Sequence, residues 1–144
     1  MKRLFAITAL LTGLWCGTAS AQWVSDDVSP QSIGPVKVSL HDGATDACWT
    51  NLREVREYVE EKLRMSGYSV VQTNAPIYSF SITVAAYRSN NQCVGRTSAE
   101  LFKVTVVDEI FGEFVVGSYH YVANRNSNLN NLVITTVQGL IDEM

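Results

Sequence analysis

Histidine is scarce in this sequence, which contains only His41 and His120 among its 144 residues. Neither histidine lies in a short metal-binding spacing such as H-x-x-x-H, and two histidines alone hold a metal ion weakly. The sequence also lacks the G-x-S-x-G nucleophile elbow, the phosphate-binding loop and the dinucleotide fingerprint. We therefore predict no catalytic residue, no cofactor and no metal ligand, and a protein that is not an enzyme is the first hypothesis.

Basic residues are also few, since 11 Lys and Arg stand against 14 Asp and Glu, for a formal net charge of −3. Nucleic-acid-binding proteins carry a cluster of Lys and Arg on one face or along one helix, and this sequence has no such cluster. We therefore expect no nucleic-acid partner.

Long apolar runs are limited to one, over residues 4–15, and a run of about a dozen residues is shorter than the roughly 20 that a membrane-spanning helix needs. Two basic residues, 2–3, precede the run, and the small residues 19–21 follow it. This pattern predicts a signal peptide over 1–21 that is cleaved after Ala21. The mature protein is then soluble in the periplasm or secreted, without a transmembrane segment.

Cysteine occurs three times, and the signal peptide removes Cys16. Because the bulky Trp15 precedes Cys16, the sequence disfavours a lipoprotein signal. The mature chain keeps Cys48 and Cys93, which an oxidising compartment is expected to join in a disulfide. They are too far apart in sequence for a C-x-x-C redox pair.

The exported chain carries a net charge of −5, because removal of residues 1–21 takes away two basic residues and no acidic one. Its first residues, 22–32, are polar, include Pro30 and show no periodicity, which predicts a flexible leader. The remaining residues, 33–144, contain no internal repeat and have the size of one domain.

Apolar residues in this domain alternate, or repeat every three to four positions, in segments that predict strands and helices. In chain order these are a strand over 33–40, a helix that begins at Thr45 or Asp46 and ends at Gly67, a short strand over 68–71, strands over 77–88, 99–108 and 114–123, and a helix over 127–144. The fold class is therefore α+β, with a single four-stranded or five-stranded, mostly antiparallel sheet, two helices packed on one face and the order β-α-β-β-β-α. A strand is the alternative for residues 132–137, where β-branched residues weaken the helix.

Four tyrosines on the predicted strands form the candidate binding surface, namely Tyr78, Tyr87, Tyr119 and Tyr121. Tyrosine is enriched at protein interfaces, so those that face away from the helices would make an aromatic patch. The alternative is that these side chains fill the core. An edge strand that accepts a strand from a partner is a second route to binding.

Two other functions stay open as alternatives. A small hydrolase or metal-binding enzyme would need His41 and His120 to approach, with Asp42 as a further ligand, and this requires the first and fourth strands to be neighbours. A secreted inhibitor of a hydrolase would present the loop over 89–97, held by the Cys48–Cys93 bridge.

The order of elements resembles that of small envelope proteins built as two helices on a four-stranded sheet, such as the lipoprotein that plugs the lipopolysaccharide translocon and the N-terminal domains of periplasmic assembly factors. Residues 64–71, Arg-Met-Ser-Gly-Tyr-Ser-Val-Val, resemble the passage of such domains in which a helix ends at a glycine and a strand follows. The resemblance covers 33–144 at the level of architecture and assigns no family. The sequence thus predicts an exported binding or envelope-assembly accessory protein with a protein or envelope partner, and leaves its oligomeric state open.

Overall fold

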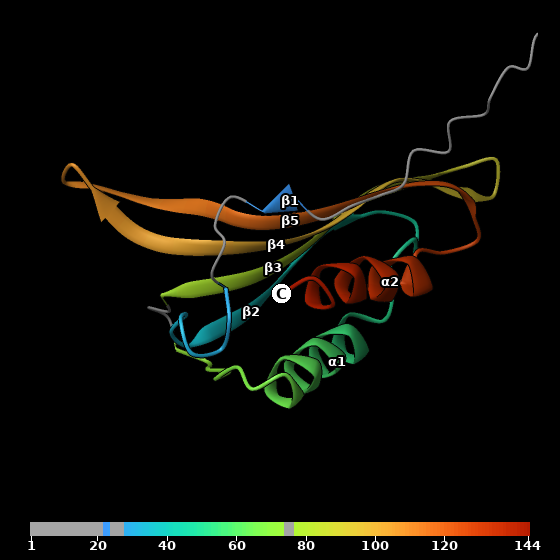
Figure 1. Ribbon diagram of the computed structural model, residues 1–144. Helices are drawn as coiled ribbons and strands as arrows, with labels where there is room; N and C mark the ends of the chain where they lie inside the picture. The colour runs from blue at the N-terminus through green and yellow to red at the C-terminus, as the bar shows by residue number, and fades with distance from the viewer. Residues whose placement is uncertain (1–21, 24–27, 74–76) are drawn as a thin grey trace, which may run out of the picture.

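One mixed sheet with two helices on one of its faces makes up the computed structural model, which describes residues 22–23, 28–73 and 77–144 (Figure 1). The elements are β1 (Gln22–Trp23), β2 (Val36–Ala44), α1 (Leu52–Met65), β3 (Tyr78–Ser89), β4 (Gln92–Val107), β5 (Ile110–Asn126) and α2 (Asn130–Ile141). The strand order is β1-β5-β4-β3-β2, and only β2 and β3 run parallel. The predicted α+β class and mostly antiparallel sheet are confirmed. The predicted signal peptide lies outside the described residues, as do residues 24–27 of the predicted leader.

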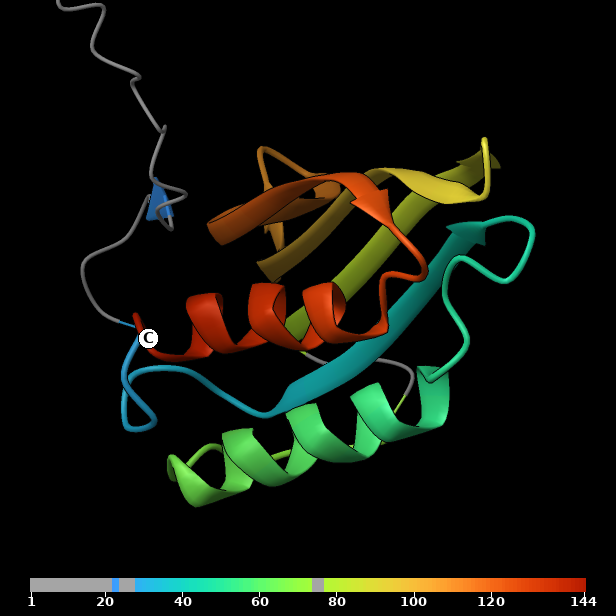
Figure 2. The ribbon, with the colours of Figure 1, turned by 90° about the vertical axis from the view of Figure 1, so that its right-hand side faces the viewer.

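The core lies between the sheet and the helix pair, which Figure 2 shows side by side across one face of the sheet. On β3 the side chains of Phe80, Ile82 and Val84 are fully buried, and they occupy alternate positions of the strand, as the alternation of apolar residues in the sequence indicates. The helices cover them with their own buried residues, which are Val55, Val59 and Leu63 on α1 and Val133, Val137 and Leu140 on α2. Among the described residues, no helix lies on the opposite face of the sheet, which we call the helix-free face.

Helix α1 begins later than predicted, at Leu52 rather than after Thr45 or Asp46. Asp46 and Ala47 have φ values of 54° and 56°, in the left-handed region that a helix cannot use. Cys48 therefore lies in a loop before the helix instead of in its first turn. The predicted end is confirmed, since Gly67 follows the helix with φ of 91°. For residues 132–137 the helix, α2, is the structure formed.

The strands β4 and β5 are longer than predicted, with 16 and 17 residues, because two-residue turns join β3 to β4 and β4 to β5. Asn90 and Asn91 have φ of 48° and 60°, and Asp108 and Glu109 have φ of 51° and 66°. Two successive positive φ values match the right-handed twist of a hairpin, which allows the ladder to continue up to the turn. Gly112, which lies between the predicted strands over 99–108 and 114–123, is a residue of β5.

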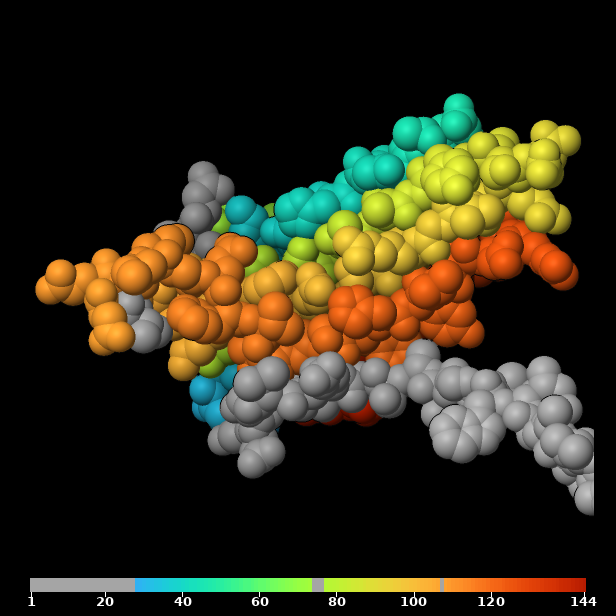
Figure 3. All heavy atoms as spheres, turned by 90° about the horizontal axis from the view of Figure 1, so that it is seen from above, coloured from blue at the N-terminus to red at the C-terminus, as the bar shows by residue number. Residues whose placement is uncertain are grey.

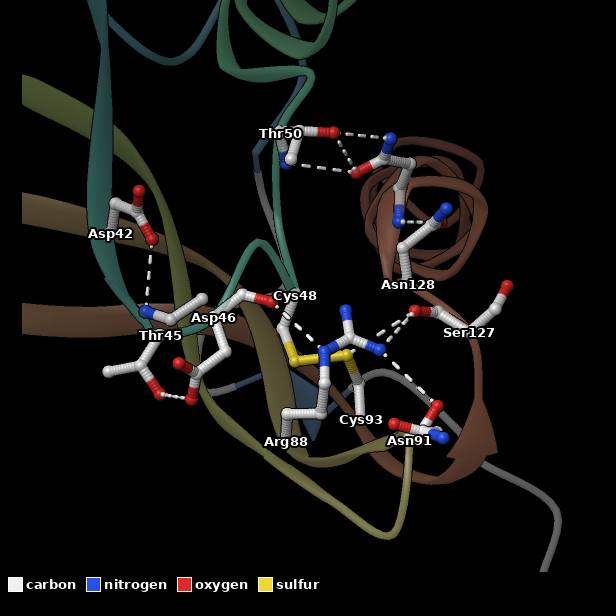
Figure 4. Close-up of a disulfide and its surroundings, with 12 residues drawn as sticks. Asp42, Thr45, Asp46, Cys48, Thr50, Arg88, Asn91, Cys93, Ser127 and Asn128 are labelled. Carbon is white, nitrogen blue, oxygen red and sulfur yellow. Dashed lines mark hydrogen bonds between the residues drawn. A yellow bond between two sulfur atoms is a disulfide. The ribbon is translucent and has the colours of Figure 1, made fainter.

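The predicted disulfide is present and joins the loop before α1 to the start of β4, with a Cα–Cα distance of 5.7 Å between Cys48 and Cys93 (Figure 4). Beside it, the guanidinium group of Arg88 donates to the carbonyl oxygens of Asp46 at 3.1 Å and Ser127 at 3.1 Å. The bridge and this arginine hold three loops together at one end of the sheet.

A segment that precedes β2 also packs on the core. Val28 and Ile33 are buried, and the hydroxyl of Tyr68 donates to the carbonyl oxygen of Val28 at 2.8 Å. Burial of this phenol raises the pKa of Tyr68. Neither described helix has the length and apolar character that a membrane-spanning helix requires.

A buried pair of hydroxyls links β4 to α2 and gives a test of the packing. Thr136 donates to the carbonyl oxygen of Leu132 at 2.8 Å, so in the contact between the two threonine hydroxyls Thr97 is the donor and Thr136 the acceptor. Both side chains are fully buried. We expect Thr136→Val to lower the free energy of unfolding by about 1–3 kcal/mol, because it leaves the Thr97 hydroxyl unpaired.

The matched variant Thr97→Val should cost less, since Thr136 keeps its bond to Leu132. The double variant should regain most of the loss, because it leaves no unpaired buried donor. Urea unfolding of the four proteins measures these values. The assigned direction of the Thr97–Thr136 hydrogen bond would be contradicted if both single variants lost the same free energy of unfolding and the double variant lost the sum of the two.

Candidate functional site

The last part of the β4–β5 hairpin extends past the rest of the sheet. Tyr78, the first residue of β3, pairs with Lys103, and beyond that point β4 and β5 pair with each other, from Val104 with Glu113 to Val107 with Ile110. We call residues 104–113 the hairpin arm. In Figure 1 it projects beyond β2, β3 and both helices. The arm is thus a two-stranded element, and neither of the described helices covers it.

Apolar side chains on the arm are exposed to an unusual degree. Val106, Ile110 and Phe111 keep 60%, 70% and 71% of their surface exposed, and at the base of the arm Phe114 and Val115 keep 46% and 40%. Apolar residues occur on both faces of the ladder, so no orientation of the hairpin could bury all of them. An exposed contiguous apolar patch of this kind marks an interaction site.

The charge of the arm is acidic. Asp108 and Glu109 form its turn, and Glu113 lies on β5 next to Phe114. Within the described part of the chain these three carboxylates form no ion pair. The arm therefore offers apolar contact area and carboxylates that are available to a basic partner.

A second exposed patch lies at the opposite end of the helix-free face, which Figure 3 shows. The register brings Ala85, Arg96 and Val122 into one row across β3, β4 and β5. Tyr87 lies two residues further along β3 on the same face, and Tyr87 and Val122 are 58% and 78% exposed. We call these four residues the far patch. Arg96 forms no ion pair among the described residues, so the far patch is apolar and basic.

The two histidines predicted as alternative ligands do not come together. His41 on β2 and His120 on β5 occupy one row of the sheet, with Thr83 and Ser98 between them. Three strand spacings of about 4.8 Å separate them by about 14 Å. The enzyme hypothesis required the first and fourth predicted strands, which are β2 and β5, to be neighbours, and this condition is not met because β3 and β4 lie between them. In the described ranges no group of three His, Cys, Asp or Glu side chains could hold a metal ion.

The four tyrosines of the predicted surface lie on different faces. Tyr78 is buried, and Tyr119 packs its ring against Gly139 of α2, where a Cβ atom would approach the ring to 2.6 Å. Tyr121 pairs with Thr97 on the helix side of the sheet and is 39% exposed. Of the four, Tyr87 alone reaches the helix-free face, so they do not form one aromatic patch.

The loop over 89–97 that the inhibitor hypothesis requires is mostly strand. Ser89 ends β3 and Gln92 begins β4, which leaves the turn Asn90–Asn91 as the only part outside the ladder. The region presents a tight hairpin end beside the disulfide, and no extended loop.

Sequence reasoning missed the hairpin arm. The predicted strands ended at Asp108 and resumed at Phe114, so Ile110 and Phe111 were assigned to a turn. A signal was present, because apolar residues on both sides of Asp108–Glu109 violate the alternation of a strand with one buried face.

The fold and surface together define an α+β protein with a helix-covered face, an open face and a projecting apolar hairpin. Comparison with protein-family models finds no match, and comparison with curated proteins finds none either. Among solved structures, a PelC dodecamer from Paraburkholderia phytofirmans is similar with 15% identity and a TM-score of 0.49, over 88% of this chain and 93% of that chain.

Two further similar structures have lower scores. A protein from Xanthomonas campestris assigned to DUF330 shares 12% identity at a TM-score of 0.37, over 87% of this chain and 86% of its own. A lipoprotein from Neisseria meningitidis shares 16% identity at a TM-score of 0.32, over 77% of this chain and 99% of its own. Similarities of this size carry no argument about what this chain binds.

Proposed function

We propose that this protein is an exported, non-enzymatic binding or envelope-assembly accessory protein that engages a protein partner through its hairpin arm. The exposure of Val106, Ile110 and Phe111 on an element that extends past the rest of the sheet carries the proposal. When a partner covers exposed apolar side chains, the complex is stabilised by about 25 cal/mol per Å² of apolar area removed from water. The signal-peptide pattern of the sequence supports export.

The acidic turn supports a protein partner over a lipid surface. If the tip entered a bilayer, the carboxylates of Asp108 and Glu109 would enter with it, and an acidic side chain at membrane depth costs about 3 kcal/mol or more. A protein partner can instead pair each carboxylate with Lys or Arg while it covers the apolar side chains. The position of the carboxylates beside the apolar cluster therefore matches a protein surface.

Photo-crosslinking in the producing cell tests this proposal. A photoreactive amino acid in place of Phe111 should give a discrete protein adduct after illumination, because that side chain would lie inside the interface. The matched control replaces Glu57, whose side chain is 72% exposed on the solvent face of α1. Adducts from position 111 that are no stronger or more specific than those from position 57 would overturn the proposal.

A further inference from the structure

We infer that the partner of the hairpin arm is a second copy of this chain, in which the far patch receives it. The inference rests on the proposed function and names the partner for the same site. The arm combines exposed apolar side chains with carboxylates, and the far patch combines exposed apolar side chains with the guanidinium of Arg96. None of these charged groups forms an ion pair with another of the described residues. Each chain therefore carries two surfaces that complement each other in charge and in polarity.

The two surfaces cannot meet within one molecule. Phe111 and Val122 both lie on β5, eleven residues apart, and a strand advances about 3.3 Å per residue. They are thus separated by about 36 Å along a continuous strand, and Figure 3 shows the arm and the far patch at opposite ends of the face. Only the arm of another copy can reach the far patch.

Such a contact joins the head of one copy to the tail of the next. The first and last copies in a row each keep one unused surface, an arm at one end and a far patch at the other. Further copies can therefore add, and the row either closes into a ring or continues as a filament. A two-fold dimer in which arm meets arm is disfavoured, since it would bring Asp108, Glu109 and Glu113 of both copies together.

The exposed area suits a weak, reversible contact. Val106, Phe111 and Val115 lie on the helix-free face of the ladder and together expose on the order of 300 Å² there, whereas Ile110 and Phe114 lie on its other face. An equal area on the receiving copy gives a total of about 600 Å², in the range of weak and transient interfaces. The charged pairs add specificity and a dependence on salt, because the Debye length falls from about 10 Å at 0.1 M to about 3 Å at 1 M salt.

Reciprocal charge reversal tests the inference on the exported protein, purified without its signal peptide. Glu113→Arg changes the formal charge of the arm from −3 to −1 and reverses the charge at position 113, and Arg96→Glu makes the far patch acidic. Glu113 lies within a regular strand, so its replacement does not disturb the turn. Sedimentation velocity measures the mass distribution against concentration. We expect the wild-type protein to assemble, and each variant alone to need at least tenfold higher concentration to do so.

A mixture of the two variants should assemble again. The positive charge at position 113 of one variant then faces the negative charge at position 96 of the other, and the unchanged arm of the second variant fits the unchanged far patch of the first. Arg53→Glu is the matched control, because Arg53 is 91% exposed on α1 and lies away from both surfaces. It should leave assembly unchanged, and circular dichroism should show native folding for all variants.

A wild-type protein that stays monomeric at every concentration, or variants that do not complement each other, would overturn the inference. If position 111 nevertheless crosslinks to a different protein in the cell, the proposed function stands and the second copy is excluded as the partner. If position 111 gives no specific adduct and no assembly occurs, both fail.

Discussion

Replacement of Cys48 and Cys93 by Ala lowers the free energy of unfolding by about 4 kcal/mol, because the bridge closes a loop between residues 45 apart in sequence. The chain-entropy account assigns this to the larger conformational freedom of the unfolded chain without the crosslink. For a domain of this size a loss of 4 kcal/mol corresponds to a decrease of about 15 °C in Tm. Both sulfur-bearing side chains are fully buried, so Ala avoids the added cost of a buried hydroxyl that Ser would bring.

Urea unfolding of three samples measures this effect: the oxidised wild type, the wild type with reductant, and the Cys48→Ala/Cys93→Ala variant. The second and third samples should agree within about 1 kcal/mol, since both lack the crosslink. A variant that unfolds at the same urea concentration as the oxidised protein would show that the bridge does not constrain the unfolded chain.

The loop before α1, which carries Cys48, shows why the sequence predicts the buried face of this helix correctly and its first residue incorrectly. Apolar spacing on α1 identifies Val55, Val59 and Leu63 as inward-facing, and all three are fully buried. The start of α1 depends on the backbone of Asp46 and Ala47, which adopt positive φ next to the tertiary contact with Arg88. Local propensity contains no information about that contact, so it placed the helix start too early.

The candidate site depends even more on long-range arrangement. The strand order decides whether His41 lies near His120, and the register between strands decides whether Tyr119 faces the helices. Neither the strand order nor the register can be predicted from the pattern of a single sequence. The hairpin arm arises because β3 begins at Tyr78, opposite Lys103, while β4 and β5 continue. The apolar residues of the arm are visible in the sequence. Their exposure, however, depends on β3 beginning later than the paired ends of β4 and β5.

A close approach of two backbones at Gly95 predicts a second large loss of stability. A Cβ atom at this position in β4 would lie 2.6 Å from the Cα atom of Ala86 and still closer to the carbonyl oxygen of Ala85. Because these are backbone atoms of the neighbouring strand β3, no side-chain rotation relieves the overlap. We expect Gly95→Ala to lower the free energy of unfolding by about 3 kcal/mol, at the upper end of the usual cost of overpacking.

Gly112→Ala is the matched control, because it makes the same chemical change in β5, where the nearest atoms are ring carbons of Phe114 at 3.5 and 3.7 Å. Those are ordinary contact distances, so this variant should be neutral or gain up to about 1 kcal/mol from the lower entropy of its unfolded chain. Urea unfolding of both variants separates the two cases. Equal effects at 95 and 112 would mean that β3 and β4 are not in close contact at Gly95. Because Arg96 follows Gly95 directly, the same displacement should also weaken assembly through the far patch.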